Sequence, residues 1–204
     1  MTNALDTYTA AARRAMARAG ILAADAGRHT LDDVHILLAL TETRPFDRPP
    51  TAFTLTPNAT RAAMDGADGA DGGDARDRDP LGDRDARDRD LLAALGVDLD
   101  EVRRRLRGLV ALDDPALWRL HRARLRPLRV TLSGPPGDLV LTGRARKVIE
   151  VAAGRWREPG PVRGEDLLWG VLCDHTNPAL RVLRAGGVDV RRLAAELNSA
   201  RPAA

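Results

Sequence analysis

Few residues of this sequence have the type and spacing that catalysis or metal binding requires. The four histidines, His29, His35, His121 and His175, show no H-x-x-x-H spacing and no Cys/His metal-ligand pattern. The single cysteine, Cys173, lies in an apolar run without a neighbouring base, so we expect a buried structural thiol. There is no Ser/His/Asp arrangement and no G-x-x-x-x-G-K-[ST] phosphate-binding loop. The sequence therefore predicts a binding protein that is not an enzyme and that uses no metal or cofactor.

One segment has the composition of a nucleic-acid-binding surface. Residues 117–126 (LWRLHRARLR) contain four arginines and predict a basic amphipathic helix that ends at Pro127. Alternatively, this helix is a solvated connector that packs through Leu117, Leu120 and Leu125. The formal net charge of the chain is only +3, which by itself does not indicate a nucleic-acid partner. A nucleic-acid-binding regulator is therefore kept as the alternative function.

The composition is that of a soluble protein whose core is built from Leu, Ala and Val. The chain has 204 residues, of which 44% are hydrophobic, 30% charged and 3% aromatic. Its longest apolar runs, 36–40 and 91–95, are far shorter than the roughly 20 residues that span a bilayer. The first residues lack the basic and apolar regions of a signal peptide, and a single cysteine excludes an internal disulfide. We expect a cytoplasmic protein without a membrane partner.

A low-complexity stretch interrupts the chain. Residues 65–90 are almost entirely Gly, Ala, Asp and Arg, with Leu81 as the only large apolar side chain. Such a composition cannot bury enough surface to offset the entropy cost of ordering. The preceding residues 44–60 contain four prolines, which is typical of a loop. The sequence therefore predicts a disordered insertion at about 43–88.

Outside this stretch the apolar residues follow helical spacing, and the same order of helices occurs twice. Residues 34–40 align with 165–171, and residues 95–99 align with 185–190. The sequence therefore predicts an all-α fold made of two pseudo-symmetric four-helix repeats. The expected helices span residues 9–26, 33–41, 91–95 and 98–107 in the first repeat and 142–157, 165–174, 179–185 and 189–197 in the second.

Both units resemble a known repeat. The second unit, LTGRARKVIEVAA followed by GEDLLWGVL and NPALRVLRAGGVDVRRLAAEL, is similar to the Clp repeat. That repeat occurs twice in the N-terminal domain of the Clp/Hsp100 unfoldases, particularly those of the ClpC type. The first unit, YTAAARRAMARAGILAADAGRHTLDDVHILLALTE with ALGVDLDEVRRRL, resembles the same repeat. The resemblance implies the all-helical double repeat of that family.

The resemblance also implies how the chain is divided. In the family this domain precedes ATPase modules, whereas the only lysine here, Lys147, does not lie in a phosphate-binding loop. We therefore expect a free-standing, bacterial recognition domain without the ATPase modules. The expected parts are repeat 1 at 1–107 with its insertion at about 43–88, a basic connector at 108–138, repeat 2 at 139–198 and a tail at 199–204.

Binding residues are implied at the helix starts. In the family, the domain binds substrate peptides, adaptors and, in some members, phosphoarginine, where a Thr that starts the first helix approaches an acidic residue that starts the second. Helix N-termini offer N–H groups to a phosphate, and a carboxylate holds a guanidinium. Repeat 2 keeps Thr142 and Glu165 at these positions; repeat 1 keeps Thr9 but has Val34 at the acidic position, with Asp33 one residue earlier. The alternative for Thr142 and Glu165 is helix capping without a ligand.

Cyclic-peptide antibiotics directed at Clp bind the family's domain near the same helix starts. The aromatic residue that precedes the Thr is kept as Tyr8 in repeat 1 and is replaced by Leu141 in repeat 2, while Arg146 stands at the usual basic position. A domain without a motor that binds such a compound acts as a decoy for the unfoldase. We therefore expect a regulator or decoy of ClpC that binds peptides, adaptors, phosphoarginine or such antibiotics.

Overall fold

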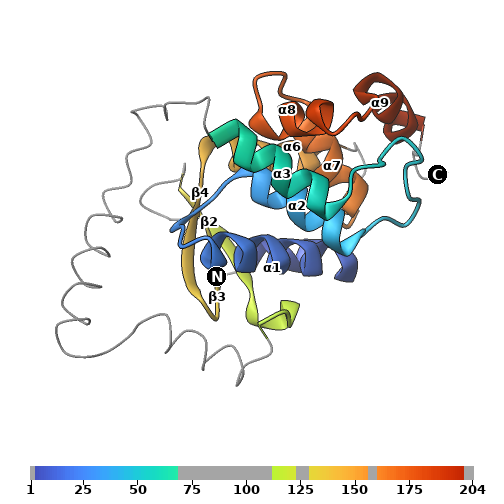
Figure 1. Cartoon of the computed structure of the whole chain (residues 1–204). Coiled ribbons are helices and arrows are strands. Elements are labelled where there is room, and N and C mark those ends of the chain that lie inside the picture. Colours follow the sequence, from blue (N-terminus) through green and yellow to red (C-terminus); the bar gives the residue numbers. More distant parts are fainter. Residues whose placement is uncertain (1–2, 69–111, 123–128, 156–159, 200–204) are drawn as a thin grey trace.

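The computed structural model describes residues 3–68, 112–122, 129–155 and 160–199, in which helices pack together with a small sheet at one end (Figure 1). Repeat 1 contributes the 3-10 turn η1 (Ala4–Thr7), α1 (Ala10–Asp25), β1 (Thr30–Leu31), α2 (Asp33–Thr43) and α3 (Pro57–Asp68). The connector contributes η3 (Pro115–Leu117), β2 (Arg119–Arg122), β3 (Val130–Gly134) and β4 (Gly137–Leu141). Repeat 2 contributes α6 (Gly143–Gly154), α7 (Gly164–Leu172), α8 (Pro178–Ala185) and α9 (Val190–Ser199).

The first helix of each repeat begins directly after a threonine. Thr9 Oγ1 accepts a hydrogen bond from the N–H of Ala12, and Thr142 Oγ1 accepts one from the N–H of Ala145, both at 3.2 Å. A hydroxyl at the N-cap satisfies a backbone donor that has no partner inside the helix. The helical starts that the sequence predicts for the two repeats are therefore confirmed.

The prediction of an all-α fold is wrong, because the structure contains a sheet. Strand β1 of repeat 1 and the three strands β2, β3 and β4 lie in the order β1-β4-β3-β2; β1 pairs with β4 in parallel, and the other pairs are antiparallel. In β3, the buried Val130 and Leu132 flank the polar Thr131; in β4, Leu139 and Leu141 are buried and Val140 between them is half-buried. Alternation with a period of two is the pattern of a strand with one buried face. The turn between Gly134 and Gly137 is Pro-Pro, so a G-P-P-G hairpin signal was present in the sequence.

The basic amphipathic helix expected at 117–126 is also wrong. Residues 119–122 form strand β2, and residues 123–128 lie outside the described part of the chain. Trp118 and Leu120 are fully buried, whereas Arg119 is exposed. The apolar positions that pack are thus two residues apart, rather than the three and five residues that separate Leu117, Leu120 and Leu125.

The expected disordered insertion contains a helix. Residues 57–68 form α3, which packs against α2 as α8 packs against α7, and α3 and α8 contact each other. The two helices start alike: Thr56 and Asn177 accept hydrogen bonds from the N–H groups of Ala59 and Ala179, and a proline follows each cap. The third helix of repeat 1 is therefore α3, and the helices expected at 91–95 and 98–107 lie outside the described residues.

The two repeats are interlocked. The segment before α2 pairs in parallel with the segment before α6, Thr30 with Val140 and Leu31 with Leu141. The segment before α7 pairs in the same sense with the segment before α1, through a bridge between Tyr8 and Val162. The start of each second helix therefore lies beside the start of the other repeat's first helix.

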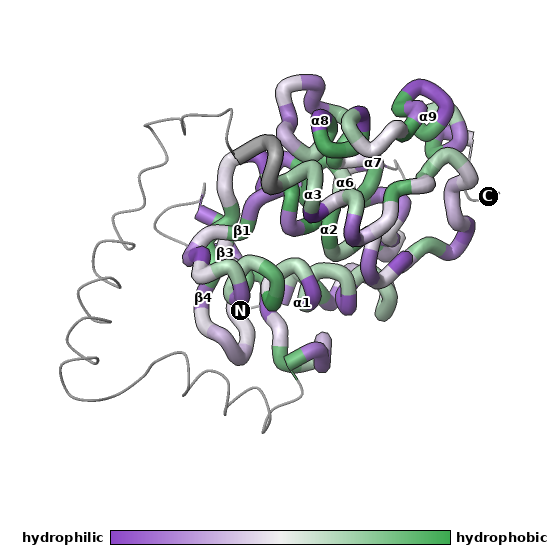
Figure 2. Tube along the Cα trace, viewed as in Figure 1, coloured by the Kyte–Doolittle hydropathy of each residue, from purple (hydrophilic) through white to green (hydrophobic). Residues whose placement is uncertain are grey.

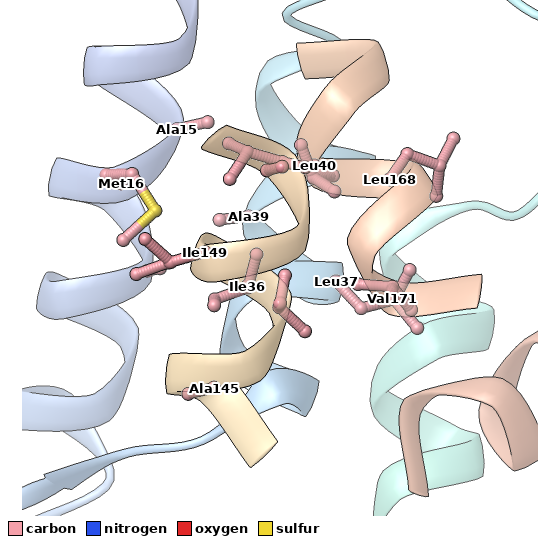
Figure 3. Packing of buried hydrophobic residues seen from close by; sticks show 14 of the residues in the cluster. Ala15, Met16, Ile36, Leu37, Ala39, Leu40, Ala145, Ile149, Leu168 and Val171 are labelled. Carbon is pink, nitrogen blue, oxygen red and sulfur yellow. The ribbon is translucent and has the colours of Figure 1, made fainter. Parts of the chain in front are cut away.

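One core joins the helices of both repeats. Figure 3 shows side chains of α1, α2, α6 and α7 meeting there, among them Met16, Ile149, Leu37 and Val171. The helices differ in how much of their surface the core covers (Figure 2): α8 and α9 contribute one apolar face, whereas most residues of α2 and α7 are buried. The indole of Trp118, fully buried, lies so close to Gly20 that a Cβ there would be 2.2 Å from Cζ3.

Candidate functional site

We expected the threonine and the acidic residue of each site to come from one repeat, but the interlocking places each threonine beside the other repeat. Thr142 Oγ1 donates a hydrogen bond of 2.8 Å to Oδ1 of Asp32, which caps α2 of the other repeat. The N–H of Thr9 donates a hydrogen bond of 2.9 Å to the carbonyl of Val162, three residues before Glu165. Each Thr therefore lies beside the acidic helix start of the opposite repeat.

Thr142 and Glu165 themselves lie at opposite ends of a helix pair. Arg155, directly after α6, contacts Asp166 at the start of α7, and Lys147 in the first half of α6 pairs with Asp174 just after α7. The two helices are thus antiparallel. Because α6 has 12 residues, it separates the start of α6 from the start of α7 by about 18 Å.

The start of α2 carries two adjacent carboxylates. Asp33 is 0% exposed, and its Oδ2 accepts a hydrogen bond of 2.9 Å from the N–H of Ala179 in α8. The Arg144 guanidinium lies over the pair, with Nη2 3.6 Å from Asp32 Oδ2 and Nε 3.8 Å from Asp33 Oδ1. This cluster, consisting of Asp32, Asp33, Thr142 and Arg144, joins α2, α6 and α8.

The pKa values of the two carboxyls of this cluster are shifted in opposite directions. Burial raises the pKa of Asp33 to about 8, and the hydrogen bond and the negative charge of Asp32 act in the same direction. Burial also acts to raise the pKa of Asp32, but the hydrogen bonds from Asp33 and Thr142 and the charge of Arg144 outweigh it, so the pKa of Asp32 is lowered. At neutral pH, Asp33 is therefore the protonated partner and Asp32 the charged one.

The start of α7 carries Glu165, which is only 6% exposed. Its Oε1 accepts a hydrogen bond of 2.8 Å from the backbone N–H of Arg48, in the loop between α2 and α3. Its Oε2 is buried and has no hydrogen-bond partner among the described residues. Gly164 beside it faces the backbone of Pro45, whose carbonyl oxygen would be 2.2 Å from a Cβ at that position.

Two other predicted site residues, Tyr8 and Arg146, differ in their exposure to solvent. Tyr8 is buried, and burial raises the pKa of its hydroxyl above the usual range. Its ring belongs to the core and is not available at the surface, which is a correction to the expected aromatic contact. Arg146 is partly exposed on α6 and lies 3.9 Å from the carboxylate of Glu150, one turn along the helix.

Sequence reasoning missed Arg144 and Arg48 as neighbours of the helix starts; it placed Asp32 or Asp33 at the start of the second helix but missed the contact of Asp32 with Thr142. Asp32 and Arg144 carried a signal, because each lies within two residues of a predicted site residue. Arg48 carried none, because its contact depends on a loop whose path the sequence does not fix. The expectation that Cys173 is buried is wrong, since this residue, directly after α7, is exposed.

A groove on repeat 2 contains none of the predicted site residues. It has a volume of about 510 Å³ and lies between α6, α7 and α9. The guanidinium of Arg155 lies over the Trp169 ring at 4.9 Å from its centroid. The other polar residues that line the groove are Lys147, Glu150 and Asn198.

The structure describes three arginines of the basic connector, Arg119, Arg122 and Arg129. Arg122 pairs with Glu150 at 3.0 Å, and Arg119 is exposed on edge strand β2. In the part of the chain that the structure describes, no three His, Cys, Asp or Glu side chains are grouped so as to hold a metal ion. None of the described helices combines the length and the apolar character needed to cross a membrane.

Comparison with known proteins agrees with the resemblance seen in the sequence. The chain is similar to the N-terminal domain of the caseinolytic protease associated chaperone ClpD from Arabidopsis thaliana, seen in its crystal structure. The TM-score is 0.57 over 96% of this chain and 95% of that chain, at 14% sequence identity. No family model and no curated protein matches the sequence. In its fold, the chain is therefore a Clp N-terminal domain-like protein.

Proposed function

We propose that this protein is a non-enzymatic recognition module of the Clp protease and chaperone system, which binds peptides or adaptors and acts as a regulator or decoy of ClpC. The Clp N-terminal domain fold supports a role in that system. The observation that carries the proposal is the pseudo-symmetric pair of helix starts, where Asp32 lies beside Thr142 and Glu165 follows the segment that pairs with Thr9.

The chemistry of these starts suits a ligand that carries both positive and negative charge. The Arg144 guanidinium already lies between Asp32 and Asp33, which supports guanidinium binding there. Its side chain is 42% exposed, so it can turn toward solvent and leave the Asp32 carboxylate to an incoming arginine. The first N–H groups of α6 and α7 are suitable donors for a phosphate or a carboxylate. Phosphoarginine combines both features and is therefore a suitable test ligand.

Isothermal titration of the purified protein with phosphoarginine, and separately with a ClpC-directed cyclic peptide, tests this proposal. We expect saturable binding of at least one, without turnover, and a loss of about tenfold or more in affinity for phosphoarginine in Glu165→Gln or Asp32→Asn, because each variant removes a charge that would hold the guanidinium. Glu150→Gln, an exposed carboxylate elsewhere on α6, is the matched control and should bind as the wild type does. Absence of saturable binding to either compound, or equal binding by all variants, would contradict the proposed sites.

A further inference from the structure

A short segment of the chain covers the start of α7. We call residues 46–51 the strap; it follows Pro45 and precedes the buried residues Ala52 and Phe53. The N–H of Arg48 donates its hydrogen bond to Glu165 Oε1, and Asp47 lies 3.5 Å from the guanidinium of Arg163, the N-cap residue of α7. The strap thus presents a backbone donor to the acidic residue and a carboxylate to the basic residue beside it.

The far end of the strap is attached to α9. Thr51 Oγ1 donates a hydrogen bond of 2.5 Å to Oε1 of Glu196, and the N–H of Ala52 donates one of 3.0 Å to Oε2 of the same residue. Arg192 lies beside this contact and pairs with Glu196. The contacts of Thr51 and Arg192 with Glu196 are exposed, and the Ala52 contact is part-buried.

Between these two attachments the strap is loosely built. It contains no helix or strand, and Asp47, Arg48, Pro49 and Thr51 are exposed. Pro49 and Pro50 lack N–H groups, so Arg48 is the strap's donor to Glu165. The flanks are fixed, since Arg44 donates hydrogen bonds to the carbonyls of Phe53 and Leu55. The strap can therefore leave α7 while its two ends stay in the core.

The strap satisfies only part of the hydrogen-bonding capacity of the α7 start. Glu165 is more than nine-tenths buried, yet only Oε1 is used, and Oε2 has no hydrogen-bond partner among the described residues. A buried carboxylate oxygen without a donor is costly, so a ligand that supplies two donors satisfies this group better than the strap does.

We propose that the strap is an internal ligand of the α7 start, and that the partner is an extended peptide that replaces it. Such a peptide offers a main-chain N–H to Oε1 of Glu165, a second donor to Oε2 and a carboxylate to Arg163. This inference rests on the proposed function, because it assumes that the start of α7 is a recognition site. A tethered strap competes at an effective concentration on the order of millimolar, so it weakens every peptide that uses the site.

Two measurements on the full chain test the inference. The first is hydrogen exchange at the Arg48 amide in the wild type and in two release variants that do not alter Glu165. Glu196→Ala removes both hydrogen bonds at the far end, and Thr51→Val removes the one made by the Thr51 hydroxyl. The second is titration with the peptide acetyl-PFDRPPT-amide, which copies residues 45–51, and with a matched peptide that has Asn in place of Asp. Glu150→Ala is the control variant, and circular dichroism verifies that each variant is folded.

We expect the Arg48 amide to exchange at least about fivefold faster in Glu196→Ala and in Thr51→Val than in Glu150→Ala. We also expect both release variants to bind the Asp peptide at least about fivefold more tightly than the wild type does, and the Asn peptide more weakly than the Asp peptide.

Equal peptide binding by the wild type and the release variants, or no peptide binding by any of them, would overturn the inference. Phosphoarginine binding that is the same in all variants would keep the proposed function and reject the strap as its competitor. Peptide binding with no phosphoarginine binding would keep the strap and reject phosphoarginine as the ligand.

Discussion

The hydroxyl of Thr142 donates a 2.8 Å hydrogen bond to Oδ1 of Asp32, and this bond ties the first helix of repeat 2 to the second helix of repeat 1. The two residues are 110 positions apart in the chain. Each expected ligand site therefore contains residues of both repeats. A change at one repeat's helix start should consequently affect the site assigned to the other repeat.

Removing the Thr142 hydroxyl should cost more stability than removing that of Thr9. Both hydroxyls cap a helix with a 3.2 Å bond, but Thr142 also donates to Asp32, whose half-buried carboxylate loses a donor in the variant. We expect Thr9→Ala to lower the free energy of unfolding by about 1 kcal/mol, and Thr142→Ala by about 1 kcal/mol more. Urea denaturation at pH 7 measures both. Equal losses would show that the bond between the repeats contributes nothing.

The pH dependence of stability should report the protonation of Asp33. Its pKa is raised in the folded state, to about 8, by burial and by neighbouring Asp32. The folded protein therefore binds more protons than the unfolded chain between pH 4 and pH 8, so this contribution is complete below about pH 4 and is lost as the pH rises through 8. In Asp33→Asn the amide can imitate the protonated carboxyl.

Denaturation curves of the wild type and Asp33→Asn, recorded from pH 5 to pH 9, test this assignment. We expect similar stability at pH 5 and an advantage of at least about 1 kcal/mol for the variant at pH 9, which corresponds to one unit of pKa. A difference between the two proteins that does not change over this range would mean that Asp33 is ionised throughout.

Adding a methyl group at Gly20 should disturb the packing of the sheet on α1. A Cβ there would lie 2.2 Å from Cζ3 of the fully buried Trp118, so the indole must shift. We expect Gly20→Ala to lower the free energy of unfolding by about 1–3 kcal/mol. Gly143→Ala is the control, because nothing lies within 4 Å of a Cβ at the start of α6. Thermal unfolding of both variants distinguishes an effect on packing from a general effect of replacing glycine by alanine. A Gly20→Ala variant as stable as the wild type would contradict the close contact with Trp118.

The buried ion pair of Arg155 with Asp166 should contribute more to the free energy of unfolding than the exposed pair of Arg122 with Glu150. Arg155 and Asp166 are 5% and 3% exposed, whereas Arg122 and Glu150 are 62% and 45% exposed, and both pairs have a 3.0 Å contact. We expect Arg155→Met to cost about 3–5 kcal/mol, because it leaves Asp166 buried without its cation. Arg122→Met should cost about 0–1 kcal/mol. Urea denaturation of the two variants gives both values, and similar costs would contradict the burial difference.

The helices were predictable because their signals are local. The caps Thr9 and Thr142, the Asn177-Pro178 start and the helical spacing of apolar residues all lie within the helices that they specify. Strand β1 was missed for the opposite reason: it pairs with β4, so Thr30 meets Val140 across a long stretch of chain, whereas the β3-β4 hairpin carried the local G-P-P-G signal. A two-residue strand carries no pattern of its own. Its existence depends on the interlocking of the repeats.

The candidate site was predictable only in part. The resemblance identified Thr142, Glu165 and Asp33 as polar residues at helix starts, which is where the structure has them. It did not identify which starts meet, because that depends on the parallel pairing of segments from different repeats. Nor did it identify the strap, since a Pro-rich loop has no spacing that predicts its contact with Glu165.

The central claim, that helix starts built from both repeats form the recognition surface, is tested most directly by nuclear magnetic resonance. The backbone amides of the ¹⁵N-labelled protein should be followed during titration with phosphoarginine, in the wild type and in Asp32→Asn. We expect saturable shifts at the starts of α2 and α6 together, since Asp32 and Thr142 share one hydrogen bond, and both sets should disappear in the variant. Saturable shifts confined to the groove around Trp169, or no saturable shifts at all, would contradict the account.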